Sequence, residues 1–331
     1  MAVMLLKTLS ALLLARETHA KITQNRLYSD DMILESREAY DIRPFIAGFG
    51  DTPGEKVEVT FVGHTYPTTV LADGTWEVQM NCCDYLTDQH LEVKGESNAF
   101  NYTNVACGQV YVCGGQSNME LPLSYVDGGG AEIATANRPN WRFFRVPHTP
   151  SDTPQTDMIA EDPDTKMPAK WLVSNSTNAA KFSAVCYLSA KHISEMLWGD
   201  APFGLIWASW GGTRVEAWAP EAATKKACPS AAAMPAETGP QKFSVLYNGM
   251  IHPLTKYSIR GAFWFQGEHN VVTHSSREEY AHLSLFSSTF TLFYFTFTPF
   301  YSSLCSHFAS LLLDLTRFFL HASGMPACSG A

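Results

Sequence analysis

The sequence has a deficit of positive charge and one long stretch with no charge of either sign. Its 331 residues include 23 Lys and Arg against 32 Asp and Glu, which gives a formal net charge of −9. Nucleic-acid-binding proteins present basic patches, so no nucleic-acid partner is expected. Charged residues make up 17% of the chain, yet residues 281–313 contain no Asp, Glu, Lys or Arg. The composition of this segment therefore differs from that of the sequence before it.

The sequence also lacks a cluster of His, Cys and carboxylate residues at the spacing of metal ligands. Neither a metal nor another cofactor is expected. The eight cysteines fit an oxidising compartment, although the sequence does not fix how they pair. Adjacent Cys82 and Cys83 are expected to bond to different partners.

Residues 1–20 resemble an interrupted secretory signal. A short apolar core spans residues 5–15 and a small residue, Ala20, ends a cleavage-like pattern, but Lys7 breaks the core. The alternative is an ordinary N-terminal helix. Two N-glycosylation acceptor patterns, at Asn101 and Asn175, also favour secretion. We therefore expect a secreted or lysosomal protein.

Residues 21–105 have the pattern of a small β-sandwich. Polar and apolar residues alternate over Lys56–Val62, as in a strand with one solvated face. Asp73-Gly74 is typical of a hairpin turn, and Trp76, Val78 and Met80 alternate down the predicted return strand. Short strands separated by turn residues favour a sandwich, whose expected role is structural or at most glycan contact.

From residue 106 the pattern changes to alternating strands and helices. Apolar residues recur at helical spacing between Phe182 and Leu197, with Thr177 or Asn178 as the predicted N-cap and Gly199 as the predicted stop. Buried strands are predicted before and after this helix, which favours an α/β fold with a parallel sheet.

Three predicted buried strands end in polar, glycine-containing turns. These turns are Gly115–Asn118, Trp210–Thr213 and Gln266–Asn270. Ligands of parallel sheets bind beyond the carboxyl ends of the strands, so all three turns should open on one edge. Ser117 should start a helix, where free N–H groups can stabilise an oxyanion. This arrangement fits acyl transfer, whereas the alternative for Ser117 alone is a helix N-cap without chemistry.

These turns carry long motifs that resemble a known family. The motifs are Gly115–Met119, Ala208–Trp218 and Trp264–Glu268, supported by Asn248–Leu254. The first lacks the second glycine of the α/β-hydrolase nucleophile elbow, so that family does not fit. All four resemble the sialate O-acetylesterases, which belong to the SGNH class of serine hydrolases, and the likeness covers roughly residues 27–283.

The resemblance implies an SGNH or flavodoxin-like parallel sheet with flanking helices, preceded by the small β-sandwich module. It divides the chain into a signal segment (1–20), the β-sandwich module (21–105), an incomplete esterase domain (106–283) and an anomalous tail (284–331). It also implies a carbohydrate esterase that hydrolyses O-acetyl groups of sialic acid through a serine nucleophile and an acyl-enzyme. O-acetylated sialic acids or sialoglycans are the implied partners. Neither a preference for the 9-O- or 4-O-acetyl position nor an oligomeric state follows.

The family's functional residues map onto these motifs. Ser117 matches the nucleophile, Gly212 matches the glycine whose N–H holds the oxyanion, and the Gln266 amide is an additional candidate donor. Four further positions are candidates for substrate binding or for orienting the site: Gln116, Asn118, Arg214 and Glu268. For Arg214, a contact with the sialate carboxylate and a plain salt bridge are equally open. His269 replaces the small residue that usually follows the family's Gly-Glu.

The catalytic base is missing from this pattern. A serine nucleophile needs a base and a carboxylate that orients it, and in the family an aspartate and a histidine near the C-terminus supply both. Here Asp314 and His321 are seven residues apart and outside any family motif. Of the other histidines, Ile-His-Pro at His252 is more typical of a structural role, and His274 or His282 would need a fortuitous geometry. The base is therefore left unassigned.

The segment from residue 284 onward is rich in Phe, Ser and Leu, and it has three interpretations. We favour a translated intron or alternative reading frame. A membrane span over residues 284–313 is disfavoured by Pro299 and the many Ser and Thr, and the third interpretation is an aggregation-prone β edge. The functional alternative is accordingly a catalytically inactive, truncated homologue that lacks the His and Asp.

Overall fold

A computed structural model describes residues 21–36, 44–80, 85–222, 238–269 and 292–293. The predicted signal segment and all of the tail except residues 292–293 lie outside these ranges, as do Cys82, Cys83, His274 and His282. Within them, no helix is long and apolar enough to cross a membrane.

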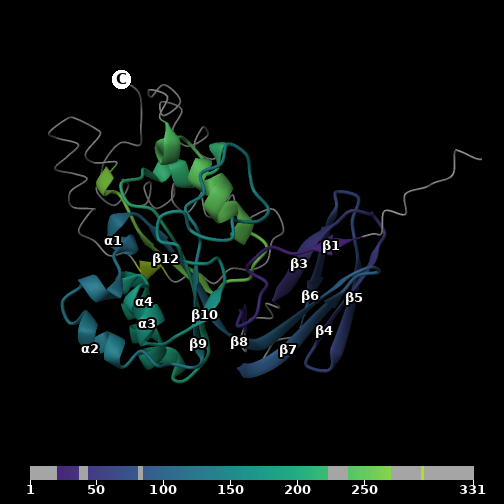
Figure 1. The fold of residues 1–331 in the computed structure, drawn as a ribbon, viewed down its shortest axis with the longest axis horizontal. Helices are drawn as coiled ribbons and strands as arrows, with labels where there is room; N and C mark the ends of the chain where they lie inside the picture. The colour runs from purple at the N-terminus through teal and green to yellow at the C-terminus, as the bar shows by residue number, and fades with distance from the viewer. Residues whose placement is uncertain (1–20, 37–43, 81–84, 223–237, 270–291, 294–331) are drawn as a thin grey trace, which may run out of the picture.

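The N-terminal part contains two antiparallel sheets (Figure 1). One consists of β1 (Ile22–Thr23), β3 (Phe45–Gly50) and β6 (Thr75–Gln79); the other contains β5 (His64–Thr69), β4 (Lys56–Phe61), β7 (Leu86–Lys94) and the first half of β8 (Ala99–Gly115). Trp76 of one sheet and Val57 and Val93 of the other share one buried cluster. The predicted sandwich is confirmed.

The predicted turn at Asp73-Gly74 is present, but the predicted hairpin is wrong, because the strands on either side of the turn do not pair with each other. Strand β4 instead turns back through Val62-Gly63 into β5, a strand that sequence patterning missed, while β6 crosses over and pairs with β3. Strand β5 lies at an edge and is largely exposed, so it carries no apolar alternation that would reveal it. The predicted alternation in β6 holds at Trp76, which is fully buried.

Strand β8 connects this part to the α/β part. Its first half pairs antiparallel with β7, and its second half runs parallel to β11 (Phe203–Ser209) on one side and β12 (Gly261–Phe265) on the other. The sheet continues through β9 (Trp141–Arg145) and β10 (Trp171–Val173), and β2 (Ile33–Glu35) and β13 (Leu292–Phe293) pair with β8 and β12. The predicted boundary after residue 105 falls inside β8, and the division into domains stays a prediction.

Helical segments cover both faces of the parallel part of this sheet. Tyr111 and Cys113 of β8 pack in the cluster that contains α4 (Ala184–Ile193). The alternate residues Val110 and Val112 pack in the other cluster, with η3 (Val215–Trp218) and η6 (Tyr247–Ile251). The remaining helical segments are α1 (Ser117–Glu120), α2 (Gly129–Ala134), α3 (Ser176–Ala180), η1 (Leu123–Tyr125), η2 (Ser194–Trp198), η5 (Gly239–Gln241) and η7 (His252–Leu254). The predicted α/β class is therefore confirmed.

The predicted long helix between residues 182 and 197 begins later than expected. Ser183 caps α4 by accepting a hydrogen bond from Cys186 N at 3.1 Å, so the predicted caps Thr177 and Asn178 are wrong. Asn175 caps the separate helix α3. Gly199 ends the helical segment with φ +56°, as predicted, because glycine tolerates this left-handed region.

The three strand ends lie level with one another. Ser209 and Phe265 both stand opposite Gly115 in the register. A Cβ atom on Gly115, where φ is +137°, would lie 2.0 Å from the carbonyl oxygen of Phe265. Only glycine therefore lets β8 turn toward Ser117 while it remains next to β12.

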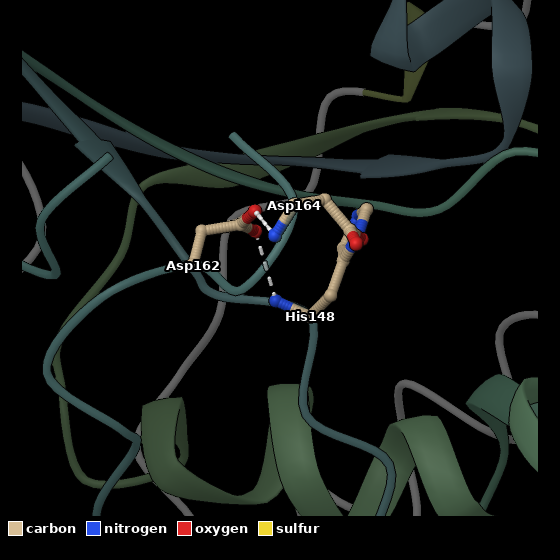
Figure 2. A group of neighbouring side chains, drawn as sticks. All are labelled: His148, Asp162 and Asp164. Atoms are coloured by element: carbon tan, nitrogen blue, oxygen red, sulfur yellow. Dashed lines mark hydrogen bonds and ion pairs between the residues drawn. The ribbon is translucent and has the colours of Figure 1, made fainter. Parts of the chain in front are cut away.

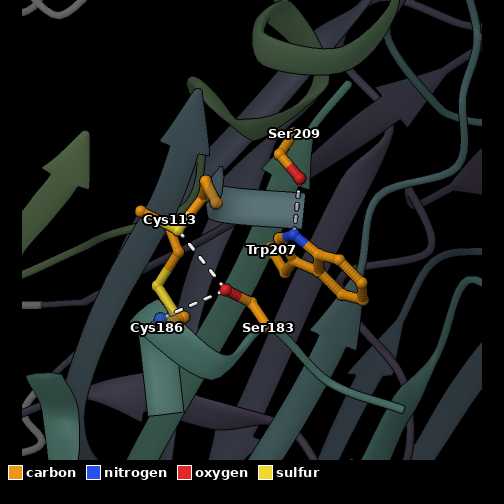
Figure 3. Close-up of a disulfide and its surroundings, with 6 residues drawn as sticks. Cys113, Ser183, Cys186, Trp207 and Ser209 are labelled. Carbon is orange, nitrogen blue, oxygen red and sulfur yellow. Dashed lines mark hydrogen bonds between the residues drawn. A yellow bond between two sulfur atoms is a disulfide. The ribbon is translucent and has the colours of Figure 1, made fainter. Parts of the chain in front are cut away.

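A disulfide fastens the end of β8 to α4 (Figure 3). It joins Cys113 to Cys186, whose Cα atoms are 5.7 Å apart. Ser183, the cap of α4, also donates a hydrogen bond to the sulfur of Met119. Cys107 is disulfide-bonded too, so every cysteine in the described ranges is oxidised.

Candidate active site

Ser117 begins α1 and its side chain faces solvent. The N-cap position belongs to Gln116, and no side chain caps this helix. Among the described residues, the Ser117 hydroxyl has no hydrogen-bond partner. The interpretation of Ser117 as a capping serine is therefore wrong, and its hydroxyl is accessible to a substrate.

The turn after β11 lies directly against Ser117. A Cβ atom added to Gly211 would be 3.5 Å from the Cβ of Ser117. The Gly211 N–H donates to Oε2 of Glu120 at 2.6 Å. Gly212 adopts φ +70°, and its N–H makes no hydrogen bond within the described residues. The N–H that the sequence predicted as an oxyanion donor thus belongs to the residue after Gly211 and is unengaged, and its role as a donor stays a prediction.

The turn after β12 is hydrogen-bonded to the turn after β11. Gln266 donates from Nε2 to the carbonyl oxygen of Thr213 at 3.0 Å and accepts from Trp264 Nε1 at 3.1 Å. The amide therefore has one N–H left to donate. The role of Gln266 as an oxyanion donor stays a prediction.

Hydrogen bonds also join the Ser117 turn to residues 267–269. Asn118 Nδ2 donates to Glu268 Oε1 at 2.6 Å. Gln116 is buried, and its Oε1 accepts from the N–H groups of Gly267 and His269 at 3.4 and 3.2 Å. Glu268 thus contacts the residue that follows Ser117. Its two predicted roles, orienting the active-site groups and binding substrate, stay predictions.

Arg214 lies just beyond the Gly211–Gly212 turn and is half-buried. Its backbone N–H donates to Oε1 of Gln241 at 3.3 Å, and Nε2 of Gln241 donates to the carbonyl oxygen of Gly212. Gln241 therefore holds this turn at Gly212 and Arg214, whereas Glu120 holds it at Gly211. A contact between the Arg214 guanidinium and a substrate carboxylate stays a prediction.

Sequence reasoning missed a buried charged network behind the nucleophile. Oε1 of Glu120 lies 3.1 Å from Nε2 of His148 and 3.4 Å from Nη2 of Arg145. Nδ1 of His148 lies 2.7 Å from Asp164, and Nε of Arg145 lies 3.2 Å from Asp162. The network therefore alternates anions and cations from Asp164 to the helix that carries Ser117.

The surroundings of these groups set their pKa values. Burial lowers the pKa of His148, but its contacts with Glu120 and Asp164 outweigh burial and raise the pKa above its ordinary value. Burial raises the pKa of Glu120, and its contacts with His148, Gly211 and Arg145 outweigh this and lower it. These contacts therefore favour the protonated form of His148 and the ionised form of Glu120.

His148, Asp162 and Asp164 form the group best placed to hold a metal in the described residues (Figure 2), which the sequence spacing did not indicate. Their ligand atoms lie within 4.8 Å of one another. However, a metal needs an unprotonated imidazole nitrogen, whereas both ring nitrogens of His148 face hydrogen-bond partners. Arg145 also neutralises Asp162 directly. These residues fit a salt-bridge network better than a metal site.

His148 and His252 both make structural contacts. The Nε2 of His148 contacts Glu120 and the carbonyl oxygen of Ser209, and its ring stacks on Trp210 with centroids 4.1 Å apart. Nδ1 of His252 lies 2.7 Å from the carbonyl oxygen of Gln155. The described residues thus place both rings in structural contacts, as the sequence favoured for His252.

The predicted glycosylation acceptors occupy different environments. Asn101 is exposed on β8. Asn175 is half-buried, and its Oδ1 accepts from Asn178 N at 2.9 Å while its Nδ2 donates to the carbonyl oxygen of Val173. Asn175 therefore has a capping role in the fold.

Comparison with known proteins agrees with the motifs and the geometry. Residues 107–286 match the family described as carbohydrate esterase, sialic acid-specific acetylesterase. The chain belongs to this family. Sialate O-acetylesterases from Pongo abelii and Homo sapiens are each 32% identical to it over 269 residues, covering 73% of this chain. A carbohydrate acetylesterase from Xanthomonas citri superposes with a TM-score of 0.64 at 27% identity, covering 80% of this chain and 55% of the bacterial one.

Membership of this family supports the predicted SGNH-type fold. The chain spans about half the length of the curated relatives it matches, 48% in both primate proteins. The matched region contains all three turns around Ser117.

Proposed function

We propose that this protein is a carbohydrate esterase that removes O-acetyl groups from sialic acid. The observation that carries the proposal is the exposed Ser117 hydroxyl at the start of α1, with Gly211 of the turn after β11 against it. The next residue, Gly212, has an N–H that makes no hydrogen bond within the described residues. A nucleophile and an oxyanion donor side by side are the two elements that acyl transfer requires. The sialate O-acetylesterase relatives support the choice of substrate.

In the proposed reaction the Ser117 oxygen attacks the acetyl carbonyl carbon. The negative oxygen of the tetrahedral intermediate accepts hydrogen bonds from the N–H groups of Gly212 and Ser117. The bond between the acetyl carbon and the sugar oxygen then breaks. The sugar oxygen takes up a proton and leaves as a hydroxyl group, and the acetyl group remains on Ser117. Water attacks this acyl-enzyme through a second tetrahedral intermediate and releases acetate. The base that accepts the Ser117 proton is not assigned among the described residues.

Substrate recognition and location belong to the same proposal. Asn118, Glu268 and Arg214 lie on or next to the turns that border Ser117, and they are proposed to contact or orient the sialoside. The oxidised cysteines support a secreted or lysosomal location, and exposed Asn101 is the better placed glycosylation acceptor.

The test is acetate release from p-nitrophenyl acetate and from an O-acetyl sialoside. Ser117→Ala is expected to lower the rate at least about 100-fold, because loss of a catalytic nucleophile removes most of the rate enhancement. Ser176→Ala is the matched control, since Ser176 is also an exposed serine at the first position of a short helix. Equal rates for the wild type and Ser117→Ala would overturn the proposal and favour the catalytically inactive alternative.

A further inference from the structure

Glu120 links the nucleophile to the oxyanion turn. It lies three residues after Ser117 in the same four-residue helix, and its Oε2 accepts the Gly211 N–H at 2.6 Å. Gly212, the next residue, carries the N–H that is proposed to hold the oxyanion. A single carboxylate therefore connects the element that carries the hydroxyl to the element that carries the oxyanion donor.

The side-chain bonds from Gln241 and Gln266 to this turn do not reach α1. Gln241 donates to the carbonyl oxygen of Gly212, and Gln266 donates to that of Thr213 at 3.0 Å. Both fix the turn relative to η5 and β12. The Trp210 N–H donates to the carbonyl oxygen of Gly115, two residues before Ser117, at 3.1 Å. The Glu120 carboxylate joins the turn directly to α1, the helix that Ser117 begins.

The surroundings of Glu120 keep its carboxylate in place. From β9 and the segment after it, Arg145 and His148 contact Oε1, which leaves Oε2 directed at Gly211. Asp162 and Asp164 hold these two cations in turn. A carboxylate acceptor gives a stronger hydrogen bond to a backbone N–H than a neutral acceptor does.

We propose that Glu120 is a positioning residue of the oxyanion hole, which holds the Gly212 N–H at a fixed place relative to the Ser117 hydroxyl. The residue does not touch the reacting atoms. The catalytic part of this inference rests on the proposed esterase function, whereas the structural part does not. A donor placed in advance stabilises the transition state more than the bound substrate, so loss of Glu120 should affect kcat more than KM.

The structural arm of the test is amide hydrogen exchange of Gly211 in the full chain. Glu120→Ala is expected to speed this exchange at least about tenfold, because the amide loses its acceptor. Glu120→Gln keeps an acceptor oxygen and should stay closer to the wild type. Glu132→Ala is the matched control, because Glu132 also forms an ion pair, with Lys191 at 2.7 Å, and its side chain is 28% exposed against 27% for Glu120.

The catalytic arm measures acetate release by the same variants. Glu120→Ala should lower kcat at least about tenfold with KM changed by no more than about twofold, and Glu120→Gln should recover part of the loss. The inference is overturned if Glu120→Ala matches Glu132→Ala in both Gly211 exchange and kcat, or if it raises KM alone. If Glu120→Ala does not fold, Glu120→Gln decides by the same two readouts. Absence of any Ser117-dependent hydrolysis would remove the proposed function, and Gly211 exchange would still decide whether Glu120 holds the turn.

Discussion

Asp162 is a fully buried carboxylate whose negative charge is compensated from several directions. Its oxygens accept from the N–H groups of Thr165 and His148 at 2.7 and 3.0 Å, and Arg145 contacts it at 3.2 Å. Burial alone would raise its pKa, but these contacts outweigh burial and lower the pKa from 3.8 to about 2. The folded state therefore favours the ionised form of Asp162.

This pKa predicts how Asp162 contributes to stability at low pH. A carboxyl group with a lowered pKa in the folded state stabilises the protein above its unfolded pKa, and that stabilisation disappears as the pH falls through the folded value. The contribution should therefore be complete above about pH 4 and lost toward pH 2. Asp162→Asn should lower the free energy of unfolding at pH 7 by on the order of 2 kcal/mol and flatten its pH dependence in that window.

Urea unfolding at a series of pH values measures both effects. Asp127→Asn serves as the control, since Asp127 is exposed and makes no hydrogen bond within the described residues. An Asp162→Asn variant with the same acid dependence as the wild type would show that Asp162 is not preferentially ionised in the folded state.

At the scale of elements, the position of Ser117 depends on how β8 is fastened at its carboxyl end. Strands β11 and β12 pair with it on both sides, and the Cys113–Cys186 disulfide ties it to α4. The cross-link lies four residues before Ser117 and closes a segment of 73 residues. Closing a loop of this length restricts the unfolded chain substantially.

Removal of this disulfide should destabilise the protein without removing any group from the site. The Cys113→Ala/Cys186→Ala variant is expected to lose about 2–4 kcal/mol in the free energy of unfolding. Urea denaturation of the wild type and the variant, each with and without dithiothreitol, measures this. If reduction and the double substitution both leave the midpoint of the wild type unchanged, the cross-link does not contribute to stability.

At the scale of the whole molecule, the β-sandwich and the α/β part share structure. Strand β8 belongs to both, and one buried cluster includes Trp76 of the sandwich together with Trp218 and Met250. Hydrogen bonds from the N-terminal segment reinforce the connection: Asn25 donates to the carbonyl oxygen of Pro253 and Tyr28 to that of Lys256, each at 2.9 Å. The core of the sandwich is therefore continuous with one of the two buried clusters of the α/β part.

We therefore expect the two parts to unfold together. Differential scanning calorimetry should give a single transition with a calorimetric enthalpy close to the van't Hoff enthalpy. Tryptophan fluorescence and far-UV circular dichroism should report the same midpoint. Two resolved transitions, or midpoints that differ between the probes, would mean that the sandwich and the α/β part are thermodynamically independent.

The sequence alone was sufficient for the features that depend on local pattern. Three buried strands with glycine turns predicted the level strand ends, and glycines at 115 and 212 marked the positions where the backbone adopts positive φ. Gly199 was correctly predicted to end a helix. These predictions succeeded because strand alternation and glycine conformations are properties of neighbouring residues.

Strand β5, the caps of α3 and α4 and the pairing of Cys113 with Cys186 were decided only by the tertiary structure. An exposed edge strand carries no apolar periodicity. Where two candidate caps lie a few residues apart, the packing of the helix decides which of them caps it. The pairing of cysteines likewise depends on which elements the fold brings within bonding distance.

Around Ser117, some features were likewise determined by the sequence and others only by the tertiary structure. By itself the sequence determined the serine, its glycine turn and the glycine turn after β11 in which an oxyanion donor is predicted, because these lie within short continuous motifs. Only the tertiary structure brought Glu120 to Gly211, and His148 and Arg145 to Glu120, from segments 25 to 91 residues apart. Long-range ion pairs leave no periodic pattern in a chain, since their partners are selected by the packing of the sheet and not by sequence spacing.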